Sequence, residues 1–334
     1  MSVSIKDIAK AAGVSHSTVS RALRNSPLVN SETAAQIQRL AEDMGYMPSA
    51  VAQSLVTRQT RTIGLVVTFI SDPFVDRIVD GIENLATTAG YSVFLSSSHA
   101  DPEREMDVVE TFHRRRVDGV IVLASRVGRL YGERLEELRV PIVLVNSQAE
   151  SEYLYSVSAD DEQGARMAVR HLLDLGHRRI GYIGSSSRPP SSRRRLAGYQ
   201  AELRHAGVPF DPDLVVVPET PHDLESGRLG LEPLLAAGAT AVFCYNDRTA
   251  IAVLLVARER GINVPGSLSV VGFDDIDATW YVTPPLTTIH QPRLEMGRQA
   301  VQMLLDLLAE LPVTDEWLPC RLVTRDSTAP PTDE

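Results

Sequence analysis

The stretch that decides the fold is "DIAKAAGVSHSTVSRAL", residues 7–23. Ser4 and Asp7 have the spacing of a capping box, and apolar residues then recur at helical intervals. Gly13 breaks this first helix, and Ser15 is placed to cap a second one. The sequence therefore predicts two short helices that meet across a tight glycine turn, which is a helix-turn-helix.

A third helix is expected to begin near Asn30 or Ser31 and to stop at Gly45. Its apolar side chains fall on one stripe: Ala34, Ile37, Leu40, Ala41 and Met44. The second helix has a stripe of its own that includes Val19 and Leu23. Three short helices with such stripes share one small core.

Hydrogen-bonding side chains occupy the opposite face of the second helix: His16, Ser17, Ser20, Arg21 and Arg24. They have the length and chemistry to reach base edges and phosphates, although a solvated helix surface is the ordinary alternative. Residues 1–61 carry seven basic and four acidic side chains, whereas the whole chain has a net charge of −10. Because the positive charge gathers where the helix-turn-helix lies, we expect this segment to bind DNA.

Composition places the chain as a whole in a globular class. Its 334 residues are 43% hydrophobic and 23% charged, which suits two or three cores. Two cysteines, Cys244 and Cys320, are too few for a disulfide scaffold, and the longest apolar run, residues 62–70, is half a membrane span. No charged-then-apolar leader opens the chain, so we expect a soluble cytoplasmic protein without membrane contact.

Motifs of enzymes are missing from the sequence. It has no GxGxxG or Walker loop, no GxSxG elbow and no metal-spaced His/Cys cluster; residues 178–187 come nearest to a nucleotide loop. We therefore expect no catalysis, no cofactor and no metal. A transport binding protein is the other rival, and it would have a signal peptide and no helix-turn-helix.

Residues 46–61, "YMPSAVAQSLVTRQTR", are predicted to connect the DNA-binding segment to the rest of the chain. Pro48 blocks continuation of the third helix, and residues 49–56 permit two helical turns, too few to be stable alone. Such a segment needs a partner to fold. The alternative is a plain flexible linker that exposes Leu55.

From Thr62 the pattern changes to apolar runs alternating with amphipathic stretches, which predicts an α/β fold with parallel sheets. The first series indicates buried strands at residues 62–69, 91–98, 118–125 and 140–146. The second series begins near Tyr155, with runs at 155–160, 178–184, 214–218, 239–246 and 267–275. We therefore expect two α/β lobes, followed by a helix at about 293–309 and a strand near 318–324.

Ligands of open α/β sheets bind beyond the carboxyl ends of the strands. The residues at those ends are nearly all polar: Ser71, Asp72, Phe74, Ser125, Arg126, Asn146, Asp160, Asp161, Asn246, Asp247, Asp274, Asp275 and Gln291. Carboxylates and amides beside an aromatic ring suit a polyhydroxylated ligand, because each hydroxyl is both donor and acceptor. Arg195 adds a fork that can take two ligand oxygens.

Over essentially its whole length the chain resembles the LacI/GalR family of transcriptional repressors. The resemblance is carried by "IKDIAKAAGVSHSTVSRAL" (5–23), "LLDLGHRRIGYIG" (172–184), "RLAGY" (195–199), "YNDRTAIAVL" (245–254), "SVVGFDD" (269–275) and "PPLTTIHQP" (284–292). It implies an N-terminal helix-turn-helix and a core like that of periplasmic sugar-binding proteins, with a cleft between two lobes. It also implies that the last helix returns to the first lobe, and that the connecting segment folds when two copies pair over DNA.

The resemblance assigns roles on DNA to six residues: His16, Ser17 and Arg21 at base-reading positions, Thr18 and Ser20 in phosphate contact or packing, and Leu55 as a wedge. Such a wedge enters a base step from the minor groove and kinks the duplex.

For the effector cleft the resemblance and the strand ends give Asp72, Phe74, Asn146, Arg195, Asn246, Asp274 and Gln291, with Asp160 and His222 nearby. His222 stands where relatives have aromatic residues. The alternatives are that Asp247 and Asp275 only cap helices and that Asn246 braces a loop.

We thus predict a dimeric repressor of carbohydrate-utilisation genes that binds a pseudo-palindromic operator under control of a sugar, oligosaccharide or glycoside. A purine or another non-sugar effector is the alternative. The expected domains are residues 1–47 for DNA binding, 48–61 for the hinge and 62–334 for the core. Its first lobe is expected at about 62–156 and 292–317, and its second at about 157–289 and 318–328. The proline-containing tail "RDSTAPPTDE" has no apolar heptad for a tetramerising helix, so we expect dimers.

Overall fold

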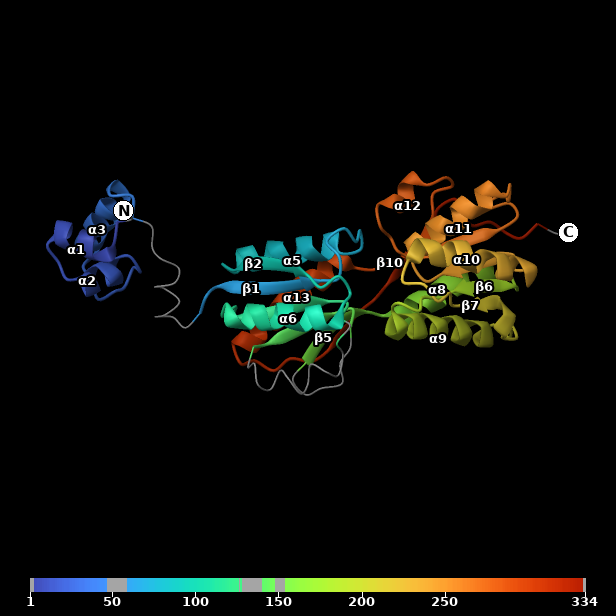
Figure 1. Ribbon diagram of the computed structural model, residues 1–334, viewed down its shortest axis with the longest axis horizontal. Coiled ribbons are helices and arrows are strands. Elements are labelled where there is room, and N and C mark those ends of the chain that lie inside the picture. Colours follow the sequence, from blue (N-terminus) through green and yellow to red (C-terminus); the bar gives the residue numbers. More distant parts are fainter. Residues whose placement is uncertain (1–2, 47–58, 126, 128–139, 148–153, 333–334) are drawn as a thin grey trace. The chain divides into compact units, whose positions relative to one another are not determined.

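The computed structural model describes residues 3–46, 59–125, 127, 140–147 and 154–332. The chain divides into two compact units, Met1–Thr60 and Arg61–Glu334. The described part of the first unit is helical, and the second unit is built on two sheets (Figure 1). Leu55 and the predicted hinge helix lie outside the described residues.

Residues 3–46 form three helices: α1 (Ile5–Ala12), α2 (His16–Ala22) and α3 (Ser31–Asp43). The Asp7 carboxylate accepts hydrogen bonds from the Ser4 backbone N–H and hydroxyl, at 2.9 and 2.7 Å, at the start of α1. Gly13 ends α1 with a φ of 65°, which glycine adopts without strain. Ser15 Oγ accepts from the Thr18 N–H at 3.2 Å and begins α2. The predicted caps and glycine turn are thus confirmed.

The three helices share one small core. Ile8, Val19 and Ala22 are wholly buried, and Ile37 of α3 is 1% exposed. The Asn30 side chain caps α3 by accepting from the Glu32 N–H at 2.8 Å. The face of α2 opposite this core is therefore left to polar residues.

The first sheet of the second unit has the described strand order β11-β5-β4-β3-β1-β2, with every neighbouring pair parallel. Its strands are β1 (Thr62–Val67), β2 (Ser92–Ser97), β3 (Gly119–Leu123), β4 (Ile142–Val145), β5 (Leu154–Ala159) and β11 (Glu316–Leu318). The helices that accompany it are α5 (Asp76–Thr88), α6 (Pro102–Arg114) and α13 (Arg293–Leu308) (Figure 1). We call this sheet with its helices the first lobe.

The second sheet has the described order β12-β10-β9-β8-β6-β7, and only β12 among these runs antiparallel to its neighbour. Its strands are β6 (Ile180–Ile183), β7 (Val215–Val216), β8 (Ala241–Cys244), β9 (Ser269–Asp274), β10 (Thr287–His290) and β12 (Arg321–Val323). The helices are α8 (Asp161–Asp174), α9 (Pro189–His205), η1 (Pro212–Leu214), α10 (Asp223–Ala236), α11 (Asp247–Glu259) and α12 (Ala278–Tyr281). This is the second lobe, and the predicted α/β class is confirmed.

Helix α13 follows a strand of the second sheet yet packs against α5 of the first lobe (Figure 1). Two glycines allow this close approach. A side chain on Gly81 would meet the carbonyl oxygen of Leu294, and one on Gly297 would meet that of Ile78. The last helix therefore returns to the first lobe, as the family resemblance implies.

Two details of the strand prediction are wrong. Strand β2 is not buried, since Phe94 is 50% and Leu95 40% exposed; it is an edge strand whose neighbour is β1. Residues 155–160 do not open the second series, because β5 pairs in parallel with β4, with Val157 opposite Val145. The first sheet thus extends to Ala159 before the chain crosses to the second lobe.

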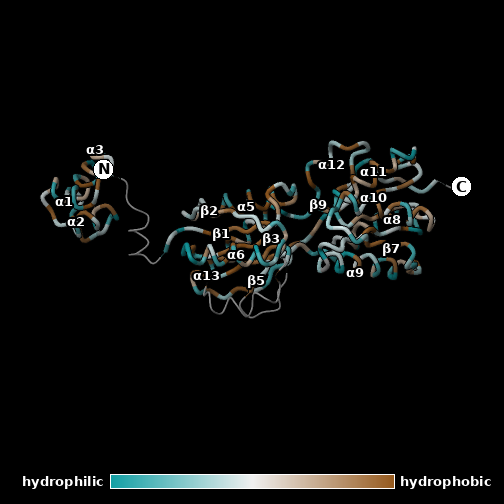
Figure 2. The backbone as a smooth tube through the Cα atoms, viewed as in Figure 1, coloured by the Kyte–Doolittle hydropathy of each residue, from teal (hydrophilic) through white to brown (hydrophobic). Residues whose placement is uncertain are grey.

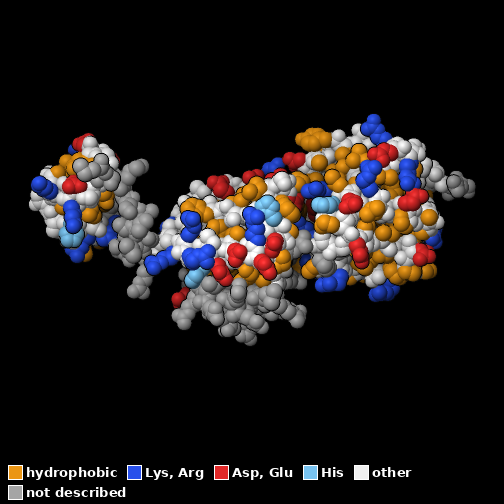
Figure 3. Space-filling model, in the orientation of Figure 1, with side chains coloured by type: hydrophobic (Ala, Val, Ile, Leu, Met, Phe, Trp, Pro, Cys, Tyr) orange, Lys and Arg blue, Asp and Glu red, His pale blue; other side chains and the backbone are white. Residues whose placement is uncertain are grey.

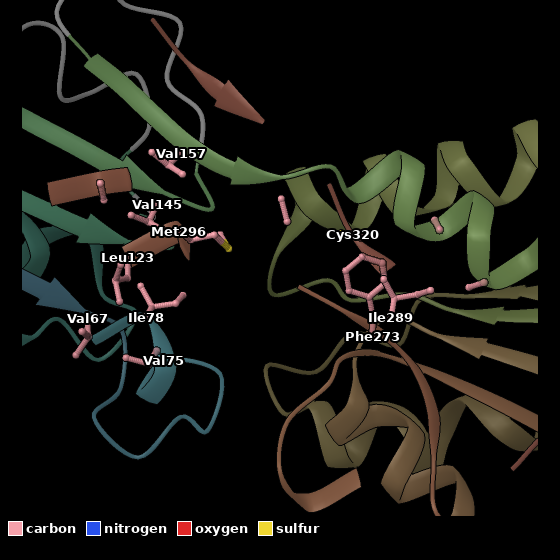
Figure 4. Close-up of a cluster of buried hydrophobic side chains, with 14 of the residues drawn as sticks. Val67, Val75, Ile78, Leu123, Val145, Val157, Phe273, Ile289, Met296 and Cys320 are labelled. Atoms are coloured by element: carbon pink, nitrogen blue, oxygen red, sulfur yellow. The ribbon is translucent and has the colours of Figure 1, made fainter. Parts of the chain in front are cut away.

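Each lobe has its own apolar interior. Figure 2 shows hydrophobic stretches running through the lobes and hydrophilic stretches on their outer segments. One cluster of buried side chains lies within the first lobe and another within the second. A third cluster has members in both lobes, and Figure 4 shows Val67, Leu123, Val145, Phe273 and Ile289 among them. The strands that end in polar residues are therefore anchored in packed cores, which gives those ends a rigid base. None of the described helices is long and apolar enough to cross a membrane.

Candidate functional site

Helix α2 presents most of the side chains that were predicted to meet DNA. His16, Ser17 and Arg21 are exposed, and Thr18 and Ser20 are half-buried. Figure 3 shows basic and histidine side chains on the side of this unit that carries α1 and α2. Leu55, the sixth residue of the predicted set, is not among the described residues.

Hydrogen bonds separate these side chains into two kinds. The Ser15 hydroxyl contacts the hydroxyls of Ser17 and Thr18 at 2.7 and 2.8 Å. Ser20 accepts twice from Arg24, at Oγ and at its carbonyl oxygen, both at 3.0 Å. Within residues 3–46 the side chains of two further members of the set, those of His16 and Arg21, make no hydrogen bond. These two exposed donors are therefore available to a partner.

A cavity of about 810 Å³, part of it open to solvent, lies between the lobes of the second unit. Its wall contains Asp72, Pro73, Phe74, Ala124, Ser125, Asn146, Ser147, Ser187, Arg188, Pro190, Ser191, Arg195, Asp223, Tyr245, Asn246, Arg248, Asp274, Ile276 and Gln291. Seven of the nine predicted effector residues are in this set: Asp72, Phe74, Asn146, Arg195, Asn246, Asp274 and Gln291.

Sharp turns at the strand ends bring these side chains to the wall. Ala124 follows β3 with a φ of 51°, Asn146 follows β4 with a φ of 50°, and Asp274 ends β9 with a φ of 120°. These are left-handed conformations that residues other than glycine seldom adopt. Such strain persists where surrounding contacts fix it, and it is common at binding sites.

A chain of amides crosses the cleft floor. The Asn146 amide Nδ2 donates to Gln291 Oε1 at 3.1 Å, and Gln291 Nε2 donates to Asp274 Oδ1 at 2.6 Å. Asn146 Oδ1 in turn accepts from the backbone N–H of Ala159 at 3.2 Å. Residues from both lobes and from the crossover are thus joined in one polar network.

Arg195 of α9 is held rigidly in the wall, and it is only 3% exposed. Its Nε donates to Asp161 Oδ1 at 2.8 Å, and Nη1 donates to the carbonyl oxygen of Tyr245 at 2.5 Å. The guanidinium carbon lies 3.7 Å from the ring centroid of Phe273, and Asp274 Oδ1 is 3.8 Å from Nη1. The fork is therefore preorganised before any ligand arrives.

Charges in the wall are matched in pairs. Arg188 Nη2 is 3.4 Å from Asp72 Oδ2, a contact that joins the two lobes. Arg248 Nε is 4.0 Å from Asp223 Oδ2. The third arginine of the described wall, Arg195, faces carboxylates as well, so within the described residues each wall arginine has a carboxylate within 4.0 Å.

Two aspartates of the cleft region have raised pKa values. Burial raises the pKa of Asp274 to about 7, although Arg195, Arg293 and the Gln291 amide act in the opposite direction. Burial and the neighbouring charge of Asp274 raise the pKa of Asp247 well above its usual range. The Asp247 carboxylate accepts from the Ile276 N–H at 2.9 Å and the Thr288 hydroxyl at 2.5 Å.

Two predicted residues, Asp160 and His222, are not in the cavity wall. Asp160 Oδ1 caps α8 by accepting from the Gln163 N–H at 2.9 Å. His222 is exposed at the start of α10, where its N–H donates to Thr220 Oγ1 at 3.2 Å. The neighbour of Asp160, Asp161, instead turns toward the cleft and holds Arg195.

The alternative roles for three other residues divide as follows. The Asp247 carboxylate accepts from Ile276 and Thr288, so it holds a loop and a strand rather than capping a helix. Asn246 lines the cavity and also caps α11, since its Oδ1 accepts from the Thr249 N–H at 2.9 Å. Asp275 binds His290 Nδ1 at 2.9 Å and Arg325 Nη2 at 2.6 Å, so it anchors side chains rather than a helix. Within the described residues no group of three or more His, Cys, Asp or Glu is arranged to hold a metal ion.

Sequence reasoning missed four wall residues that complete the charge pairs and the aromatic face: Arg188, Asp223, Tyr245 and Arg248. Tyr245 directly precedes Asn246, so the strand-end rule extended by one residue would have found it. Arg188, Asp223 and Arg248 lie at helix starts, where charge is common on any protein surface.

A helix-turn-helix unit joined to a two-lobed α/β unit with a polar cleft defines a class of ligand-responsive DNA-binding regulators. Residues 4–49 match the family described as "Bacterial regulatory proteins, lacI family", and residues 169–328 match "Periplasmic binding protein-like domain". The chain is 36% identical to the HTH-type transcriptional repressor CytR of Escherichia coli (strain K12), over 97% of this chain and 96% of that protein. It therefore belongs to the lacI family of transcriptional regulators.

Solved structures agree with this assignment. The lac repressor dimer bound to operator and the anti-inducer ONPF superposes with a TM-score of 0.87 at 28% identity, covering 98% of this chain and 100% of that chain. The regulator CelR in complex with cellobiose gives a TM-score of 0.73 at 28% identity, covering 97% and 99%.

Proposed function

We propose that this chain is a cytoplasmic repressor that binds a pseudo-palindromic operator as a homodimer and changes its operator affinity when a sugar-like molecule fills the cleft. The observation that carries the proposal is the polar network of Asn146, Gln291 and Asp274, which joins the lobes at the cavity. A ligand that binds this network acts on both lobes at once. Operator and ligand affinities are then linked by one coupling free energy, typically about 1 to 3 kcal/mol.

The chemistry of the wall favours a neutral polyhydroxylated ligand. Amide and carboxylate groups from Asn146, Asn246 and Asp274 offer donors and acceptors for hydroxyls, and Phe74 and Tyr245 add flat apolar surface. Among the described wall residues each arginine already faces a carboxylate, which gives a phosphate less attraction than an unpaired arginine would. The relative solved in complex with cellobiose supports a sugar, and a purine or other non-sugar effector is the second candidate.

The first unit supplies the DNA contacts in this proposal. His16, Ser17 and Arg21 read bases, whereas Thr18 and Ser20 serve the phosphate backbone or packing. Leu55 inserts into the central step of the operator. Dimerisation is supported by the relative solved as a dimer on its operator, and light scattering of the full chain at micromolar concentration tests it against a tetramer.

A thermal-shift screen of the full chain over sugars, glycosides, nucleosides and nucleobases tests the ligand class. We expect neutral sugars or glycosides to raise the melting temperature of the core. If only a nucleobase stabilises the core, the effector is a purine or other non-sugar ligand rather than a sugar. If neither class stabilises it, the cleft is not the site of such an effector.

A further inference from the structure

Arg293, the first residue of α13, lies behind the cleft wall and is 5% exposed. Its Nη1 donates to the carbonyl oxygen of Pro73 at 2.9 Å and to Asp76 Oδ1 at 3.0 Å. Its Nη2 donates to the carbonyl oxygen of Asp275 at 2.9 Å. Pro73 and Asp76 follow β1 in the first lobe, whereas Asp275 follows β9 in the second. One guanidinium therefore bonds to both lobes, one nitrogen to each.

The carbonyl groups that Arg293 binds belong to segments that form two opposite walls of the cleft. Pro73 and Phe74 line the cavity on the side of the first lobe, and Asp274 and Ile276 line it on the side of the second. The Arg293 guanidinium carbon also lies 5.9 Å from the Phe74 ring centroid. A change in the distance between these walls must therefore break a hydrogen bond of Arg293 on one side or the other.

The other charged contact between the walls is weaker. Arg188 and Asp72 meet at 3.4 Å with side chains 23% and 14% exposed, so water competes for their bond. The Arg293 side chain is 5% exposed, and its hydrogen bonds to the carbonyl oxygens are charge-assisted. Of these two arginine side chains, that of Arg293 is thus the better shielded from solvent, although its partner Asp76 is 53% exposed.

We propose that Arg293 is a positioning residue that ties the two lobes at a fixed separation and so sets the equilibrium between lobe arrangements. Its regulatory meaning rests on the proposed function, because effector control needs the lobes to move. The tie requires two nitrogens at a fixed spacing, which arginine has. A lysine offers its donors from a single nitrogen, so it lacks the two separate nitrogens that here serve one lobe each.

Pulsed electron–electron double resonance on the full chain, without DNA or effector, measures the distance between the lobes and so tests whether Arg293 holds it. One spin label is placed on each lobe through Asp107→Cys on α6 and Arg204→Cys on α9, both at exposed positions. Cys244 and Cys320 are buried, so they are poorly accessible to the label. Labelled chain is mixed with excess unlabelled chain, so that each distance reports the two lobes of one chain.

We expect Arg293→Met and Arg293→Lys to broaden the distance distribution and shift its mean relative to the unsubstituted chain. Arg298→Met is the matched control, because Arg298 is an exposed arginine of the same helix, and it should leave the distribution unchanged. If Arg293→Met does not fold, Arg293→Lys decides the question.

A distribution like that of the unsubstituted chain in folded Arg293→Lys contradicts the tie, since charge alone would then suffice. The distance between the spin labels can change on substitution of Arg293 while no sugar changes operator binding. That outcome supports the role of Arg293 but contradicts the proposed function. The two ideas are therefore separated by the same set of proteins.

Discussion

The Asp161 carboxylate and the Arg195 guanidinium form a buried pair in the cleft wall, with Nε 2.8 Å from Oδ1 and both side chains 4% exposed. Arg194 binds the other carboxylate oxygen at 2.9 Å. The pair aims Arg195 at Tyr245 and Asp274 before a ligand is bound. Asp161 thus positions a cleft residue without being part of the cavity wall.

Arg195→Met should destabilise the core by about 3 kcal/mol or more, because it leaves the buried Asp161 with Arg194 as its remaining partner. Urea unfolding followed by the fluorescence of Trp280 and Trp317 measures this. Arg193→Met, at an exposed position of the same helix, is the control and should change stability by less than about 0.5 kcal/mol. Equal stability of the two variants would show that the buried pair is not needed.

Arg21→Ala should weaken operator binding by about 1 to 3 kcal/mol and relax preference at one base position, because its side chain is exposed on α2 and makes no hydrogen bond within residues 3–46. Selection from a randomised DNA pool measures the preference. Arg39→Ala, at an exposed position of α3, should leave the selected sequence unchanged. A selected sequence identical for Arg21→Ala and the unsubstituted protein removes Arg21 from the base-reading set.

A neutral sugar that stabilises the core should bind at least about tenfold more tightly than its phosphate ester, a difference of about 1.4 kcal/mol. The reason is that Arg188 and Arg248 already face Asp72 and Asp223. Asp72→Asn removes the carboxylate that faces Arg188, so it should reduce the difference in affinity between the neutral sugar and its phosphate ester. Calorimetric titration of both ligands into both proteins gives the comparison, and a tighter phosphate complex in the unsubstituted protein contradicts the charge pairing.

Stability should depend on pH through Asp274, whose pKa in the folded protein is about 7 because of burial. Between the ordinary aspartate pKa of about 4 and this value, the folded state holds a proton that the unfolded chain has lost. The protein therefore loses stability as pH rises through this window, by at most about 1.4 kcal/mol per pH unit.

Asp274→Asn keeps a neutral side chain throughout, so its stability relative to the unsubstituted protein should rise from pH 4 to pH 7 and then level off. Asp107→Asn, at an exposed position, is the control. Parallel pH dependence of Asp274→Asn and the unsubstituted protein in urea unfolding is the contrary result.

Local features of the fold were readable from the sequence because neighbouring residues decide them. Ser15 and Gly13 have cap and turn chemistry whatever surrounds them, and both act as expected. Asn146 and Asp274 were predicted for a similar reason, because ligands bind beyond the carboxyl ends of parallel strands and those ends meet at one edge of the sheet.

The failures concern contacts made between distant segments. Nothing local tells Asp160 from Asp161; the position of Arg195 on α9 decides which carboxylate turns to the cleft. Likewise, the apolar sequence of β2 resembles a buried strand, and only the strand order places Phe94 at an exposed edge.

The central claim is that one ligand in the cleft changes operator affinity, and operator titration with and without a stabilising sugar tests it most directly. For the unsubstituted protein the operator dissociation constant should shift by about 5- to 150-fold, which corresponds to a coupling of about 1 to 3 kcal/mol. Asp274→Ala should fold and bind operator without sugar, yet show little or no shift, because the ligand loses a partner worth about 1.5 to 3 kcal/mol. If Asp274→Ala keeps the full shift, or if no cleft ligand shifts the unsubstituted protein, the account is wrong.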